Sequence, residues 1–116
     1  MLLRTLNLLV FFVIVASSSP AQTVVINEIM TANPNAVMDD ELLNFSELAE
    51  LYNPSSKEID ISGWYLSNDP NNMRMWPFPA NTKIKQGTFL VVWMDKVDLR
   101  LHTNFRARGD NEVILL

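Results

Sequence analysis

The chain has 116 residues, and its nine Lys and Arg stand against thirteen Asp and Glu, which gives a formal net charge of −4. This length allows one domain. The acidic balance and the lack of a polybasic run argue against binding to nucleic acid or to anionic lipid. There is no cysteine, so an exported domain of this sequence must be stabilised by its core without disulfides.

The N-terminal segment has the pattern of a secretory signal peptide. Arg4 precedes an unbroken apolar run over residues 8–16, and small residues at Ser19 and Ala21 form a cleavage motif. The run is too short to span a bilayer comfortably, because spanning needs about 20 residues, although an uncleaved anchor remains an alternative. We therefore expect residues 1–21 to be a signal peptide, residues 22–116 to be one domain, and the protein to be secreted or held at the cell envelope.

The first elements of the domain are predicted as two strands with a loop between them. Residues 24–30 are rich in β-branched side chains, and residues 48–52 form a second apolar segment that ends at an Asn-Pro-Ser-Ser turn. Between them, residues 38–46 are ambiguous. Asp39-Asp40-Glu41 is compatible with one short helical turn, from which Leu42, Leu43 and Phe45 would point inward.

Residues 59–67 show a change of phase that predicts a β-bulge. Ile59 and Ile61 alternate with polar residues, whereas Trp64 and Leu66 form the apolar set after Gly63. A bulge inserts one unpaired residue into a strand, and glycine tolerates the backbone angles that this requires. We therefore predict a single strand with a bulge at Gly63.

The C-terminal half is predicted to contain further short strands. The prolines of Trp76-Pro77-Phe78-Pro79 place this segment at a sheet edge or in a crossover between sheets, because proline cannot donate to a ladder. Residues 89–94 are apolar at every position, which predicts a central strand covered on both faces. Shorter strands are predicted at residues 103–106 and 113–116.

Six or seven short strands with regular turns predict an all-β, immunoglobulin-like β-sandwich. The last strand begins where the chain stops, so we expect the domain to lack its closing strand or strands. An unpaired edge strand at residues 113–116 would favour self-association.

Six segments in this order resemble the lamin tail domain family, in its exported bacterial form. They are Val25-Ile26-Asn27-Glu28-Ile29-Met30, Glu50-Leu51-Tyr52-Asn53-Pro54, Asp60-Ile61-Ser62-Gly63-Trp64-Tyr65-Leu66-Ser67-Asn68-Asp69, Trp76-Pro77-Phe78-Pro79, Phe89-Leu90-Val91-Val92-Trp93 and Leu101-His102-Thr103-Asn104-Phe105. The resemblance implies an immunoglobulin-like sandwich, which in exported bacterial proteins often stands beside hydrolases, nucleases or CotH-type kinases.

The sequence offers little catalytic chemistry. His102 is the only histidine, and the chain contains neither a nucleophile elbow nor a glycine-rich phosphate loop. We interpret His102 as a hydrogen-bonding loop residue and predict no catalytic site and no cofactor.

Three acidic residues are weak candidates for a metal site. Asp39, Asp40 and Glu41 supply carboxylate oxygens, which suit calcium, but their spacing does not match an EF-hand loop. We interpret them primarily as a solvated loop or a helix N-terminus. Four residues are assigned structural roles: Gly63 in the bulge, and Trp64, Trp76 and Trp93 in the core.

We therefore expect a non-catalytic exported or cell-surface module that attaches to a protein or to the cell envelope through loops on a rigid scaffold. Two alternatives stay open. The chain is either the N-terminal accessory domain of a larger secreted enzyme, such as a hydrolase, nuclease or CotH-like protein, or a calcium-stabilised adhesion domain.

Overall fold

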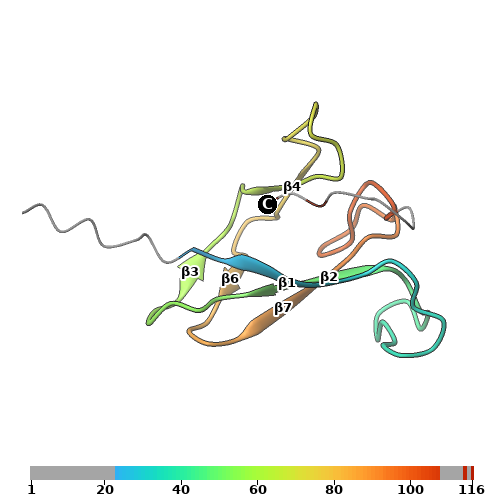
Figure 1. Ribbon diagram of the computed structural model, residues 1–116, viewed down its shortest axis with the longest axis horizontal. Helices are drawn as coiled ribbons and strands as arrows, with labels where there is room; N and C mark the ends of the chain where they lie inside the picture. Colours follow the sequence, from blue (N-terminus) through green and yellow to red (C-terminus); the bar gives the residue numbers. More distant parts are fainter. Residues whose placement is uncertain (1–22, 108–113, 115) are drawn as a thin grey trace, which may run out of the picture.

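The computed structural model describes residues 23–107, 114 and 116, and in this part of the chain all regular secondary structure is β (Figure 1). The predicted all-β class is therefore confirmed. No helix among the described residues is long and apolar enough to traverse a lipid bilayer. The predicted signal peptide lies outside these residues, as do Val113 and Leu115 of the predicted last strand. Ile114 and Leu116 carry no strand pairing.

The main sheet contains three antiparallel strands in the order β1-β2-β7. They are β1 (Val25–Met30), β2 (Leu48–Tyr52) and β7 (Phe89–Trp93). These bounds match three of the predicted strands closely, because β-branched and aromatic side chains favour β1 and β7, and the apolar segment of β2 ends at the predicted Asn-Pro turn. The register of β1 shifts between Ile26 and Glu28, so the structure has a bulge at a place where none was predicted.

The prediction that residues 89–94 form a central strand is wrong. β2 is central, and β7 lies beside it with 54% of Phe89 exposed. Phe89 stacks on Tyr52 directly across the ladder, with 4.7 Å between ring centroids. An aromatic cross-strand pair of this kind stabilises a sheet face that is half exposed to solvent. The continuous apolar run of residues 89–94 therefore did not require other elements to cover both faces of the strand.

Four shorter strands form two antiparallel pairs. β3 (Ile59–Asp60) pairs with β6 (Lys83–Ile84), and β4 (Tyr65–Leu66) pairs with β5 (Trp76–Pro77). The segment with two prolines therefore contributes only a two-residue strand to a two-stranded pair, which agrees with its predicted edge position.

The prediction of one strand with a bulge at Gly63 is wrong in its topology. Residues 61–64 form a turn closed by a hydrogen bond from Trp64 N to the Ile61 carbonyl, 3.0 Å, and this turn separates β3 from β4. Gly63 has a φ of 75°, so a positive angle is indeed required at this position. The apolar phase changes because the chain passes from one strand pair to another.

One hydrophobic core joins the three sheets. Ala49, Leu51 and Val92 of the main sheet pack with side chains from the short strands and from the C-terminal loops. The buried members are Val24, Ala49, Leu51, Ile61, Leu66, Trp76, Phe78, Ile84, Val92, Met94, Phe105, Ala107 and Ile114. Burial of this set is the main stabilising term for a domain without disulfides.

Two long connections lie at the same end of the molecule, at the right of Figure 1. The first is the β1–β2 loop, and the second follows β7. In the first, Leu42, Leu43 and Phe45 are exposed, so the prediction that they point inward is wrong. In the second, the predicted strand at residues 103–106 is absent, and Arg106 forms only an isolated bridge with Asp95.

Candidate functional site

The loop that follows β7 brings His102 back beside the end of that strand. Trp93 N donates to the Leu101 carbonyl and Thr103 N donates to the Trp93 carbonyl, both at 2.8 Å. These bonds hold His102 against the sheet, where its side chain is 2% exposed and its ring stacks on Trp93 with 6.5 Å between centroids. The only imidazole of the chain is therefore buried and fixed in orientation.

Asp95 determines which ring nitrogen of His102 carries a proton. Its Oδ2 lies 2.7 Å from His102 Nδ1, and its Oδ1 accepts from Val97 N at 3.1 Å. A carboxylate only accepts hydrogen bonds, so Nδ1 is the donor. In the neutral ring, this leaves the lone pair of Nε2 directed away from Asp95.

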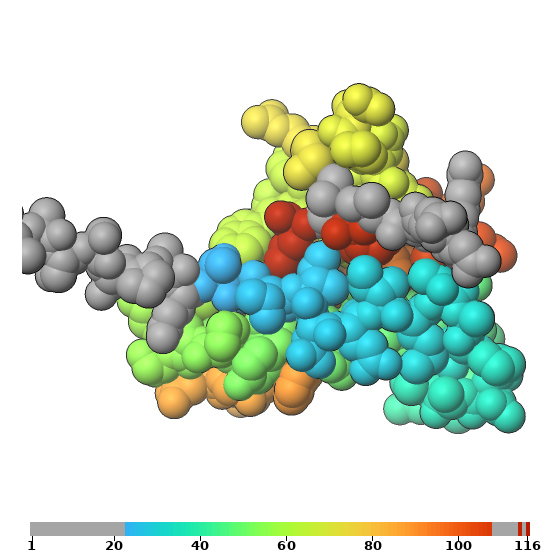
Figure 2. Space-filling model, in the orientation of Figure 1, coloured from blue at the N-terminus to red at the C-terminus, as the bar shows by residue number. Residues whose placement is uncertain are grey.

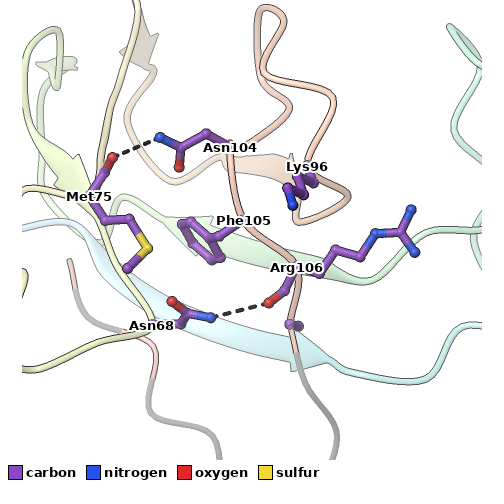
Figure 3. A pocket seen from close by; sticks show the side chains of 7 residues that line it. Asn68, Met75, Lys96, Asn104, Phe105 and Arg106 are labelled. Carbon is purple, nitrogen blue, oxygen red and sulfur yellow. Dashed lines mark hydrogen bonds between the residues drawn. The ribbon is translucent and has the colours of Figure 1, made fainter.

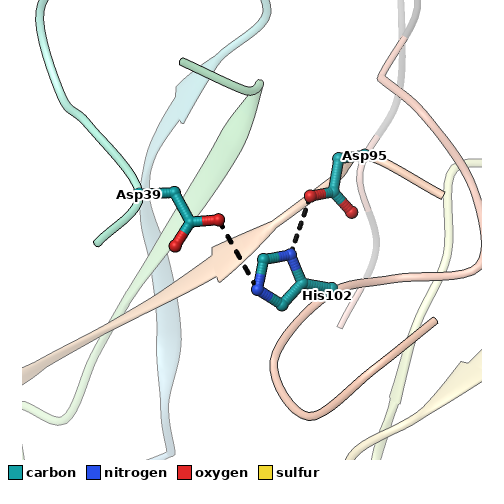
Figure 4. Close-up of side chains that lie close together, drawn as sticks. All are labelled: Asp39, Asp95 and His102. Carbon is teal, nitrogen blue, oxygen red and sulfur yellow. Dashed lines mark hydrogen bonds and ion pairs between the residues drawn. The ribbon is translucent and has the colours of Figure 1, made fainter. Parts of the chain in front are cut away.

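Asp39 approaches the ring from the opposite side (Figure 4). Its Oδ2 lies 3.6 Å from His102 Nε2 and has no hydrogen-bond partner, although the side chain is only 2% exposed. Its backbone is held by bonds with Asn44 O and Leu43 N, both 2.8 Å, and its Oδ1 accepts from Glu41 N at 2.9 Å. The β1–β2 loop thus fixes one carboxylate oxygen toward the imidazole.

Glu41 adds a third carboxylate and connects the two loops. Its Oε2 lies 3.7 Å from His102 Nε2, and its Oε1 forms a 2.7 Å ion pair with Arg100. The cluster therefore contains three carboxylates around one imidazole, with one guanidinium as the nearest balancing charge. With His102 neutral, two negative charges remain uncompensated.

The loop that supplies His102 also has an unusual backbone. Lys96, Asp98 and Arg100 have φ values of 68°, 56° and 49°, in the left-handed region that non-glycine residues rarely adopt. Such residues persist only where the surrounding contacts determine them. The Lys96 and Asp98 amides donate to Phe105 and Thr103, which holds the loop in this shape.

The structure separates the three acidic residues that the sequence put forward as weak metal candidates. Asp39 and Glu41 face His102, whereas Asp40 is exposed and makes no contact with the ring among the described interactions. Sequence reasoning missed Asp95 and gave His102 no partner. The sequence feature that could have identified Asp95 as a partner of His102 is its position, directly after an apolar strand and close in sequence to the single histidine.

The residues assigned structural roles occupy different environments. Trp76 is buried in the core, and Trp64 is half-buried and packs against it. Trp93 is half-buried and stacks on His102, so it forms part of the site. Gly63 occupies the turn described above.

A second depression lies between the C-terminal loop and the β4–β5 connection (Figure 3). Asn104 donates to the Met75 carbonyl at 2.9 Å and Asn68 donates to the Arg106 carbonyl at 3.1 Å. These amides connect neighbouring loops, and Phe105 contributes to the core. The lining side chains of this depression therefore serve mainly to hold the loops together.

The arrangement around His102 is not that of a nucleophile–base pair. Across residues 23–107, the recorded polar contacts of both ring nitrogens are with carboxylates and not with a hydroxyl group. A nucleophile–base pair requires a hydroxyl or thiol within hydrogen-bond reach of the ring. The geometry instead places two carboxylate oxygens, from Asp39 and Glu41, within 3.7 Å of His102 Nε2.

The family model described as Lamin Tail Domain matches residues 17–116. The chain belongs to the lamin tail domain family. The fold is accordingly immunoglobulin-like, which confirms the sequence resemblance, and the family is a non-catalytic one whose β-sandwich domains generally take part in protein interactions. Comparisons with curated proteins and with solved structures gave no match.

Proposed function

We propose that this lamin tail domain is a non-catalytic module of an exported or cell-surface bacterial protein, and that it attaches its carrier to a protein of the cell envelope. The proposal combines the interaction role of the family with the signal-peptide pattern of residues 1–21. The partner is a folded protein that presents an apolar patch, for the reasons that follow.

The observation that carries the proposal is an exposed apolar surface on the two loops joined by the His102 cluster. We call residues 37–45 and 96–101 the contact loops; the 37–45 loop forms the teal bulge at the lower right of Figure 2. Their exposed large hydrophobic side chains are Val37, Met38, Leu42, Leu43, Phe45, Val97 and Leu99.

These side chains are unusual for loops in contact with water. Leu43 is 73% exposed and Leu99 is 54% exposed. Contiguous exposed apolar side chains commonly mark interaction surfaces, and methionine and aromatic residues are enriched at the centres of such surfaces. The Arg100–Glu41 ion pair lies between the loops, so a partner would meet an apolar surface with a polar connection across it.

The anchoring of the contact loops supports a rigid surface. The 2.7 Å ion pair between Arg100 and Glu41 holds the second loop to the first, and Asn33 donates to the Ser46 carbonyl at 2.9 Å across the base of the first loop. A loop ordered before binding loses less conformational entropy when a partner binds. The structure therefore favours binding to a preformed surface.

The test uses a double substitution, Leu42→Ser with Leu43→Ser, in the full chain fused to a fluorescent reporter. Binding is measured to isolated bacterial cell envelopes, with and without protease treatment of the envelopes. We expect the double variant to lose at least tenfold in affinity, because apolar side chains at an interface centre each contribute about 1 kcal/mol or more. We also expect protease treatment of the envelopes to abolish binding of the unmodified chain.

The matched control is Met73→Ser on a different loop; the 50% exposed fraction of Met73 lies between those of Leu42, 39%, and Leu43, 73%. It should bind like the unmodified chain. Unchanged binding of the leucine variant, or binding that resists protease and requires intact glycan, would contradict the proposal.

A further inference from the structure

We propose that His102 Nε2, Asp39 Oδ2 and Glu41 Oε2 bind one divalent transition-metal ion, for which zinc is the best match. This inference is independent of the attachment role and goes beyond it. It concerns a site formed by residues of two loops that only the fold brings together.

The two separations measured from His102 Nε2 lie near those of tetrahedral coordination, and the half-exposed Glu41 side chain can adjust its position. Nε2 lies 3.6 Å from Asp39 Oδ2 and 3.7 Å from Glu41 Oε2. Zinc bonds of about 2.0–2.2 Å at tetrahedral angles place neighbouring ligand atoms about 3.4 Å apart. Octahedral angles with the same bond lengths would place them about 2.9 Å apart, so the tetrahedral arrangement fits better.

The Oδ2 atom of Asp39 is the second and independent observation that points to a ligand. It is buried, it has no hydrogen-bond partner, and it is directed toward the Nε2 face of the ring (Figure 4). Buried carboxylate oxygens are normally paired or coordinate metals. A cation between Oδ2 and Nε2 would satisfy the oxygen and the nitrogen lone pair together.

The charge of the cluster fits a divalent ion. Asp39, Glu41 and Asp95 carry three negative charges in their ionised forms, and Arg100 carries one positive charge at 2.7 Å from Glu41. With neutral His102, the excess is two negative charges. One divalent cation would neutralise it.

Asp95 supplies the support that a metal-binding histidine requires. It accepts the Nδ1 proton of His102 at 2.7 Å and leaves Nε2 free to coordinate. Histidine ligands in metal sites usually donate their second nitrogen to a carboxylate or a carbonyl, which fixes the tautomer and the orientation of the ring. The stacking of Trp93 on the ring adds to this fixed orientation.

The ligand set favours zinc over calcium. Calcium draws 6–8 oxygen ligands from a flexible loop, whereas imidazole nitrogen suits zinc and other late transition metals. A shallow cavity of about 280 Å³ opens beside His102, Asp39 and Glu41 and is also lined by Arg100. It leaves room for water, or for a side chain of a partner, as the fourth ligand.

The test is a zinc titration of the purified full chain after treatment with a chelator, followed by calorimetry and by thermal unfolding. We expect one equivalent of zinc to bind and to raise the melting temperature, because a ligand that binds only the folded state stabilises it. Calcium at the same concentration should do neither.

Three variants assign the effect to the site. Asp39→Asn should weaken zinc binding by more than about 100-fold, and Asp95→Asn by about 10–100-fold, the range found for outer-shell partners of metal-bound histidine. The matched control Asp40→Asn removes an exposed neighbouring carboxylate and should stay within about twofold of the unmodified chain. Asp39→Asn should still fold without metal, because its amide can donate to Nε2.

Several results would overturn the proposal. These are the absence of saturable zinc binding to the unmodified chain, equal losses in the Asp39 and Asp40 variants, and stabilisation by calcium in place of zinc. In each case the cluster would be a charged hydrogen-bonding network without a metal. The envelope-binding experiment does not depend on this outcome, because the serine variants of the contact loops leave every proposed ligand in place.

Discussion

Asn53 shows how a single buried amide holds three segments of the chain. Its side chain is fully buried, donates to the carbonyls of Lys57 and Ile84 at 2.8 Å each, and accepts from Ser55 N at 2.9 Å. All three bonds connect the end of β2 to the loop behind it and to β6. This residue belongs to the Glu50–Pro54 segment that resembles the family, so this part of the motif has a structural explanation.

We expect Asn53→Ala to destabilise the domain by about 2–4 kcal/mol. The substitution leaves two carbonyls and one amide without their partner, and each unsatisfied buried group costs about 1–3 kcal/mol, with part of the loss recovered by water. Urea unfolding followed by tryptophan fluorescence measures this difference. Asn71→Ala, at an exposed turn position, is the control and should change stability by less than about 0.5 kcal/mol.

The metal candidates illustrate what could be predicted at this scale. The sequence drew attention to Asp39 and Glu41 because adjacent carboxylates are visible in a linear pattern. It could not pair them with His102 and Asp95, because these residues meet only after the strands of the main sheet are aligned. The side chains that complete the cluster lie far away in the chain, and no local spacing encodes such a contact.

At the scale of elements, the sequence predicted the backbone conformation at Gly63 but not the topology of the segment around it. The positive φ was predictable, since an apolar phase change at a glycine requires unusual backbone angles. The topology was not, because a bulge within a strand and a turn between two strands produce the same local phase change. In the structure, the side chain and backbone of Ser62 donate hydrogen bonds to the carboxyl of Asp60. These bonds lower the pKa of that carboxyl and stabilise the turn between β3 and β4.

We expect Gly63→Ala to destabilise the domain by about 1–2 kcal/mol, the cost of a left-handed backbone for a residue with a Cβ atom. The added methyl group meets nothing within 4 Å, so the loss comes from the backbone and not from a steric clash. Denaturant unfolding measures the effect. Gly63→Asn should cost less than Gly63→Ala, because asparagine tolerates this region better; equal losses would argue against the backbone explanation.

At the scale of the whole molecule, the sequence predicted the class of fold and the family, and most strands of the main sheet. It did not predict that β2 is the central strand, because a continuous apolar run reads alike in central and edge strands. For the ambiguous segment 38–46 it suggested that Leu42, Leu43 and Phe45 point inward, although they are exposed. Hydrophobic residues in loops are ordinarily interpreted as core, and here they form the contact loops.

The central claim is that Asp95 fixes the imidazole of His102 through Nδ1 and leaves Nε2, which faces Asp39 and Glu41, available to a metal ion. Because His102 is the only histidine, the ¹⁵N NMR spectrum of the imidazole side chain reports on this site alone. We predict that Nδ1 carries the proton in the metal-free chain, and that one equivalent of zinc shifts the Nε2 resonance while Nδ1 stays protonated. A proton on Nε2 in place of Nδ1, or an Nε2 resonance unchanged by zinc, would contradict the account.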